Sequence, residues 1–135
     1  MKWYVFFIPG ILGQQCAISP DINGHVTISN SVTSIAASSF NGCFDLISVD
    51  IPDSVTSIET SAFQETSLTS VAIPDSVTSI GDSAFLFCNQ LTAVTLGNSV
   101  ASIGVSSFQG CDVLASITFP DSVTTIGNLS FSECG

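Results

Sequence analysis

The sequence predicts a single-domain solenoid, in which coils of 22 or 23 residues stack on one another. The first observation is a Ser-Val pair whose serines recur at that spacing: Ser31, Ser54, Ser76, Ser99 and Ser122. The second is a phenylalanine nine residues after each of these serines: Phe40, Phe63, Phe85, Phe108 and Phe131. Two columns that keep the same spacing indicate an internal repeat, and a period of about 20 to 50 residues is typical of solenoids.

A short apolar pattern in each coil predicts one strand. In the fourth coil it consists of Leu91, Val94 and Leu96. Val94 and Leu96 alternate, so their side chains point to one face of a strand, and Leu91 enters from the preceding turn. Two inward residues bury too little apolar surface to hold a lone strand. We therefore expect the strands of successive coils to stack in parallel and form one continuous core.

The residues between the strands predict turns. Glycines follow the isoleucine column, and we expect the chain to turn sharply there: Gly81, Gly104 and Gly127. Prolines close the strands, where a missing N–H does least harm: Pro52, Pro74 and Pro120. Residues 82–88 begin with capping residues and space Phe85 and Cys88 by three positions, which predicts one short helical turn.

The full pattern of one coil resembles a known family. It reads L-x-x-V-x-L, then I-P-x-S-V-T-x-I-G, A-F and C, and is similar to the BspA-like type of leucine-rich repeat over about residues 23–134. The resemblance implies a right-handed leucine-rich-repeat solenoid of about five turns across residues 23–135. It implies a parallel β-sheet on the concave side, with short strands, loops and short helical turns on the convex side. It also implies binding outside the cell or at its surface, rather than catalysis.

The N-terminal segment has the layout of a secretory signal. Met1 and Lys2 lead into an apolar run from Trp3 to Leu12, so we predict a signal peptide over residues 1–13. The run is too short to span a bilayer, and a buried N-terminal strand or cap is the alternative. We therefore expect a secreted or cell-surface protein, in which residues 14–22 form a loose lead-in to the repeats.

Charge excludes several classes of partner. Lys2 is the only Lys or Arg, against eleven acidic residues. Binding to nucleic acid requires cationic side chains that neutralise phosphates, and binding to an anionic membrane surface has the same requirement. We expect no nucleic-acid partner and no membrane insertion of the mature chain.

Four of the five cysteines occupy one column, three residues after the phenylalanine: Cys43, Cys88, Cys111 and Cys134. We expect buried, stacked thiols there, with one disulfide or a metal site as alternatives. Cys16 lies outside the column and is predicted to be a free or intermolecular thiol. The third coil is preceded by a connection that is one residue short, between Phe63 and Leu68, which predicts a shortened surface loop with Thr66 of the second coil outside the cysteine pocket.

Residues that suggest catalysis or metal binding have simpler interpretations. His25 is the only histidine and would be needed for any Ser-His-acid arrangement, but we expect an exposed histidine at a strand edge. The paired serines are expected to bond the turn backbone of their own and adjacent coils. Asp53, Asp75 and Asp121 are expected to be solvated turn residues, with calcium binding as the alternative. The sequence therefore predicts neither enzyme activity, nor a metal, nor a cofactor.

The outward side chains of the strands are the candidate interaction face: Ile47, Ser48, Asp50, Thr69, Ser70, Thr92, Thr95, Ser116 and Thr118. Most are small and uncharged, whereas protein-binding faces usually display aromatic residues and arginine. The leading hypothesis is protein–protein interaction or adhesion, with an unidentified protein partner. The alternative is a purely structural or surface-active solenoid, whose Thr and Ser columns resemble ice-binding arrays.

Two further expectations concern packing. Phe85 and Phe108 should be almost wholly buried, each stacked on phenylalanines of the neighbouring coils. Phe131 and Cys134 belong to the last coil, which no further strand follows, so they should lie at an unshielded end. We expect that end to be covered by further repeats of a longer protein, of which this chain is a fragment. End-to-end self-association is the alternative.

Overall fold

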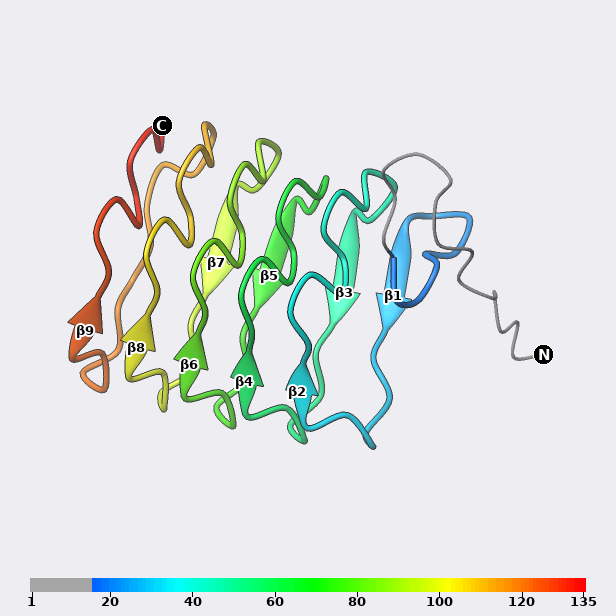
Figure 1. Cartoon of the computed structure of the whole chain (residues 1–135), viewed down its shortest axis with the longest axis horizontal. Coiled ribbons are helices and arrows are strands. Elements are labelled where there is room, and N and C mark those ends of the chain that lie inside the picture. The colour runs from blue at the N-terminus through cyan, green and yellow to red at the C-terminus, as the bar shows by residue number, and fades with distance from the viewer. Residues whose placement is uncertain (1–15) are drawn as a thin grey trace.

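The computed structural model describes residues 16–135, so the predicted signal segment, residues 1–13, lies outside the described residues. The chain winds into coils that stack along one axis (Figure 1). The first strands of successive coils are β1 His25–Thr27, β3 Ser48–Asp50, β5 Ser70–Ala72 and β7 Ala93–Thr95. The second strands are β2 Ser34–Ile35, β4 Ser57–Ile58, β6 Ser79–Ile80, β8 Ser102–Ile103 and β9 Thr125–Ile126. We number the coils 1 to 5 by these second strands.

The strands pair in parallel on two sides of the solenoid. The second strands form one five-stranded sheet in the order β2-β4-β6-β8-β9, in which the isoleucine column is in register. The first strands form two separate sheets, β1-β3 and β5-β7, and Thr95 makes a single parallel bridge to Thr118 in coil 5. The pairing of the first strands is interrupted between β3 and β5. The connection from coil 2 to coil 3 is one residue short at this point, so the residues of coil 3 are offset by one relative to those of coil 2.

The phenylalanine column forms a ladder through the core. Successive rings from Phe40 to Phe131 are stacked with centroids 5.1–5.4 Å apart and interplanar angles of at most 10°. These distances lie in the favourable range for offset stacking. Phe63, Phe85 and Phe108 are fully buried, which confirms the predicted burial and stacking.

The convex side contains consecutive turns rather than the predicted helical turn, and residues 16–135 contain no helix. In coil 3 both Ser83 and Phe87 have positive φ, of 56° and 57°. The same two positions are left-handed in every coil, and the first of them is serine in coils 1 to 4. A left-handed residue at each end of the segment prevents the backbone from continuing as a helix.

The glycines after the isoleucine column serve close packing rather than a sharp turn. A Cβ at Gly104 would come within 2.5 Å of the Asp82 backbone nitrogen in the preceding coil, and Gly81 meets the backbone of coil 2 in the same way. Their φ angles are not in the left-handed region. The predicted sharp turn is therefore wrong, and close packing between coils is the reason for glycine at these positions.

The lead-in is firmly attached, and two predictions are wrong: a free or intermolecular thiol at Cys16, and a stacked thiol at Cys43. Cys16 forms a disulfide with Cys43, across a Cα–Cα distance of 5.4 Å. The Ala17 N–H donates to the Ser39 carbonyl at 2.7 Å, just as the Phe40 N–H donates to Ala62 at 2.8 Å. Ala17 thus takes the phenylalanine position of one more, incomplete coil.

The remaining cysteines are free thiols, as predicted. Cys88 and Cys111 are buried, and Cys134 is half-buried. The thiol of Cys88 donates to the Phe63 carbonyl at 3.1 Å, and Cys111 and Cys134 repeat this bond with Phe85 and Phe108. Burial raises the pKa of the Cys88 thiol to about 11 and also raises the pKa values of Cys111 and Cys134. These thiols fill the core and are poor nucleophiles.

Thr66 occupies the cysteine column of coil 2, contrary to the prediction. It is buried, and its hydroxyl lies 3.3 Å from the Cys88 sulfur and donates to the Phe63 carbonyl at 3.0 Å. The chain keeps this core position and accommodates the missing residue immediately after it, at the surface.

Coil 5 exposes apolar side chains that earlier coils bury. Ile126 is 48% exposed, whereas Ile103 at the same position of coil 4 is buried. Phe119 is also exposed, whereas Leu96 at the same position of coil 4 is buried, and Phe131 and Cys134 are half-buried. Leu129 is exposed at a position where the earlier coils have serine. The expected unshielded end is therefore present in the last described coil.

Candidate functional site

The structure places the predicted interaction face at the surface. Eight of its nine residues are exposed: Ile47, Asp50, Thr69, Ser70, Thr92, Thr95, Ser116 and Thr118. Ser48 is the exception, because it is half-buried against His25. Ile47, 43% exposed, is the only large apolar residue of this predicted set.

His25 lies on β1 and forms a hydrogen-bonded cluster with β3. Its Nδ1 is 2.8 Å from the Ser48 hydroxyl, and its Nε2 is 3.3 Å from the Asp50 carboxylate. The ring is half-buried rather than exposed at a strand edge, which corrects that prediction. The residue types match a catalytic triad, but the Asp50 side chain is 73% exposed, and Ser48 and Asp50 come from one strand. In catalytic triads the acid is buried and orients the histidine, so this cluster is better interpreted as a surface hydrogen-bond network.

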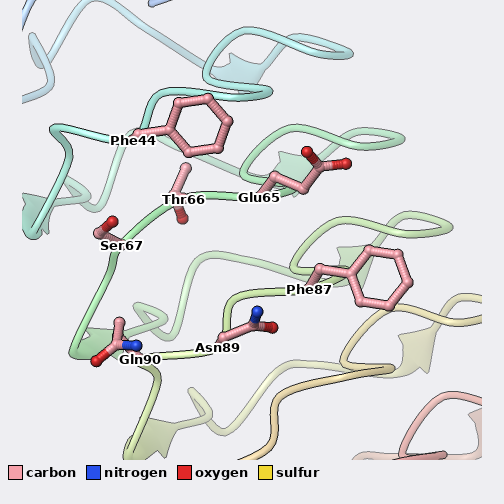
Figure 2. Close-up of a pocket in the computed structure, with 7 residues that line it drawn as sticks. All are labelled: Phe44, Glu65, Thr66, Ser67, Phe87, Asn89 and Gln90. Carbon is pink, nitrogen blue, oxygen red and sulfur yellow. The ribbon is translucent and has the colours of Figure 1, made fainter.

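A hollow that the sequence analysis missed lies over the short connection of coil 3. It has a volume of about 390 Å³ and is lined by Phe44, Glu65, Thr66, Ser67, Phe87, Asn89 and Gln90. We call it the coil 3 hollow, because it lies over the connection that leads from coil 2 into coil 3. Figure 2 shows Phe44 and Phe87 at opposite sides of it, with Thr66 and Glu65 between them. Its volume is in the range of small-ligand sites.

The short connection from coil 2 to coil 3 accounts for the hollow. Only Ser67 separates the buried Thr66 from Leu68, whereas coil 1 has Phe44 and Asp45 at this point, and coil 3 has Asn89 and Gln90. This connection is therefore shorter than the corresponding connection on either side. The longer loops on each side form the walls, and Thr66 and Ser67 lie between them.

Phe87 adopts an uncommon conformation at this site. Its φ is 57°, and the equivalent residue is also left-handed in the other coils: Gly42 in coil 1, Glu65 in coil 2, Gly110 in coil 4 and Glu133 in coil 5. The backbone cost of a non-glycine residue is therefore shared by Glu65 and Glu133 and does not single out Phe87. The ring is 42% exposed and lies over Gly110, where any Cβ would collide with it. Core packing does not explain this aromatic side chain.

The polar groups of the coil 3 hollow are mainly hydrogen-bond acceptors. Glu65 Oε1 accepts one bond, from Gln64 Nε2 at 3.1 Å. The Asn89 amide nitrogen, in the orientation that satisfies both of its partners, donates to the carbonyls of Phe87 at 3.1 Å and Gly110 at 2.7 Å. The Asn89 oxygen is then left as an acceptor. Residues 16–135 contain no Lys or Arg that could neutralise the Glu65 carboxylate.

A second hollow of about 570 Å³ adjoins the first at the lead-in, and we call it the lead-in hollow. Its lining includes Asp21, Ile22, Asp45 and Ile47, and it shares Phe44 and Ser67 with the coil 3 hollow. Phe44, 54% exposed, therefore stands between the two. Together they make a continuous surface that combines apolar and acidic side chains, and Ile47 links it to the predicted interaction face.

The other polar columns support the scaffold. The hydroxyls of Ser54, Ser76 and Ser122 donate to carbonyls of the preceding coil at 2.6–2.8 Å, as predicted for the paired serines. Threonines of the adjoining column do the same: Thr56, Thr78 and Thr124. Asp75 accepts the Asn98 N–H at 2.7 Å. Over the described part of the chain, no cluster of three or more His, Cys, Asp or Glu side chains is arranged to hold a metal ion.

Comparison with protein families identifies the repeat. Residues 19–135 match the family model described as "BspA type Leucine rich repeat region", in six copies. The chain belongs to this family. A search of curated proteins found no match. Within residues 16–135, no helix is long and apolar enough to cross a membrane.

Solved structures agree with this assignment. The Treponema pallidum (T. pallidum) leucine-rich repeat protein aligns with a TM-score of 0.78 at 29% identity, over 80% of this chain and 53% of that one. The pneumococcal vaccine antigen PcpA aligns with a TM-score of 0.76 at 28% identity, over 85% of this chain and 31% of that one. A leucine-rich repeat protein from Bacteroides capillosus aligns at 34% identity with a TM-score of 0.60, over 84% of this chain and 72% of that one. The chain therefore spans about a third to a half of the first two proteins.

Proposed function

We propose that this chain is a non-enzymatic, secreted or surface-displayed repeat module that binds a protein partner or mediates adhesion. The observation that carries the proposal is the continuous surface around the two hollows, with its exposed apolar side chains Ile22, Phe44, Ile47 and Phe87. The core has its own phenylalanine ladder, so Phe44 and Phe87 are not needed there. Exposed aromatic side chains grouped around a hollow are typical of protein-binding surfaces.

The extracellular location rests on two observations. Cys16 and Cys43 form a disulfide, and structural disulfides persist in oxidising compartments. The related pneumococcal protein is named as a vaccine antigen, which fits exposure at a cell surface. The signal-like sequence over residues 1–13 agrees with both.

The absence of enzyme activity is also part of the proposal. The Ser48, His25 and Asp50 cluster is the arrangement nearest to a catalytic one in the described coils, and its acid is exposed. We expect Ser48→Ala to leave hydrolysis of an activated ester at the level of the wild-type chain. A rate that falls upon this substitution would show that the cluster is catalytic.

Binding to purified extracellular matrix proteins tests the proposed function. The wild-type chain is immobilised beside a double variant, Phe44→Ser with Ile47→Ser, and beside a control, Thr124→Ser, on the opposite side of the coil. We expect saturable binding to at least one matrix protein, unchanged in the control and reduced about tenfold or more in the double variant. Absence of saturable binding, or equal binding by all three proteins, would contradict the proposal.

A further inference from the structure

We infer that the coil 3 hollow binds a basic side chain, arginine or lysine, presented by the protein partner. This inference rests on the proposed function and specifies the chemistry of the partner. Two observations carry it: the aromatic residues at the sides of the hollow, and its unneutralised carboxylate.

The aromatic residues provide the apolar part of the site. Phe44 and Phe87 lie at opposite sides of the hollow, and both rings are about half exposed (Figure 2). The aliphatic stem of a long side chain is favourably buried against such rings, and a cationic head group is attracted to an aromatic face. The left-handed backbone of Phe87 is common to this position in every coil, so its aromatic ring, and not its conformation, distinguishes it.

The polar residues of the hollow favour a positively charged ligand. Glu65 retains acceptor capacity, because Gln64 satisfies only one bond to its carboxylate. The Asn89 oxygen and the Ser67 hydroxyl add further acceptors to the lining. A guanidinium or ammonium group supplies only donors and positive charge, so its hydrogen bonds to this set are charge-assisted.

Charge over the whole chain strengthens the same preference. The described coils contain all eleven acidic residues of the sequence and no Lys or Arg. Asp21 and Asp45 line the adjoining lead-in hollow. A partner with a basic side chain is therefore attracted toward this surface from a distance, and an acidic partner is repelled. An uncharged saccharide could stack on the rings, but it would gain nothing from the carboxylate.

The probe for this site is Nα-acetyl-arginine amide, and its neutral isostere Nα-acetyl-citrulline amide is the matched control. Each compound is titrated into isotopically labelled protein, and backbone amide shifts are followed by NMR. We expect the arginine compound to shift the amides of Glu65, Ser67 and Asn89 saturably. The citrulline compound should bind at least about fivefold more weakly, since it lacks the charge.

Three variants separate binding from folding. Glu65→Gln should weaken the arginine compound about fivefold to tenfold, and Glu133→Gln, at the same position of coil 5, should have no effect. Phe87→Gly should also weaken binding while the fold is retained, because glycine already occupies this left-handed position at Gly42 and Gly110.

The outcomes distinguish this inference from the proposed function. Equal affinity for the two compounds, shifts located elsewhere, stronger binding of neutral methyl glycosides, or indifference to Glu65→Gln would each overturn the inference. If a matrix protein binds and its affinity is unchanged by Glu65→Gln and Phe87→Gly, the proposed function stands and the basic side-chain site fails. If the arginine compound binds but no matrix protein does, the site stands and the proposed function fails.

Discussion

The ring of Phe87 occupies the space that a side chain at Gly110 would need. An ideal Cβ at Gly110 would overlap that ring, and the Gly110 backbone is itself left-handed, with φ of 69°. The glycine is therefore required for two separable reasons, one of which lies in the neighbouring coil.

Gly110→Ala should lower the free energy of unfolding by about 2–3 kcal/mol, through the displaced ring and the strained backbone together. In a Phe87→Gly background the ring is gone, so only the backbone cost of about 1 kcal/mol should remain. Urea unfolding of the four proteins in this double-mutant cycle measures the coupling. Strictly additive effects would show that the two residues do not interact.

Cys16→Ser should detach the lead-in from the first complete coil. The disulfide closes a segment with a sequence separation of 27 residues. A loop of that length predicts a loss of about 3–4 kcal/mol in the free energy of unfolding. Thermal melts of the variant, compared with the wild-type chain with and without reductant, check this. A variant that melts like the unreduced wild-type chain would contradict the assigned disulfide.

The Cys88 thiol should make stability fall at alkaline pH. Burial favours the neutral thiol and raises its pKa from 9.0 to about 11. Its contribution is therefore fully present below about pH 9, and it is lost as the pH rises toward about 11. At the upper limit the loss is about 2–3 kcal/mol. Urea unfolding at about pH 8 and about pH 11 should show a smaller decrease for Cys88→Ala than for the wild-type chain. An equal decrease in both proteins would rule out the thiol as the cause.

A preparation of residues 16–135 should associate through the exposed face of coil 5. Strand β9 is at the edge of the five-stranded sheet, and the adjacent Ile126 and Leu129 are exposed. Such an edge favours pairing with a second copy. Sedimentation over a range of concentrations should show reversible association that Ile126→Ser weakens and Thr124→Ser does not. Monomers at every concentration would contradict the predicted association through coil 5.

The repeat spacing was sufficient to predict the coil, the buried phenylalanine ladder and the thiol column. Each of these positions has the same neighbours in every coil, so the same residue type recurs there and the pattern is visible in the sequence. The disulfide of Cys16 could not be predicted in this way, because Cys16 lies outside the column. Its pairing with Cys43 depends on the lead-in following the path of one more coil. The conformation of residues 82–88 could not be predicted from the sequence either, because Asp82 and Ser83 favour the start of a helix as much as a turn.

The candidate site was predictable only in part. The missing residue of the connection into coil 3 was visible in the spacing between Phe63 and Leu68, but its consequence depends on the neighbouring coils. A short loop leaves a hollow only when the side chains beside it stand apart, as Phe44 and Phe87 do. The outward positions of the strands, by contrast, follow from simple alternation, so the exposed face could be named in advance.

The most direct test of the central claim restores the missing residue. Inserting one asparagine between Thr66 and Ser67 gives the connection from coil 2 to coil 3 the same number of residues between phenylalanine and leucine as the connection from coil 3 to coil 4. The added residue should fill the coil 3 hollow and leave the phenylalanine ladder intact. The measurement is the affinity for Nα-acetyl-arginine amide by NMR titration, with thermal unfolding as the control for folding. The account predicts a folded protein whose affinity falls at least about tenfold, whereas a folded protein with unchanged affinity would contradict it.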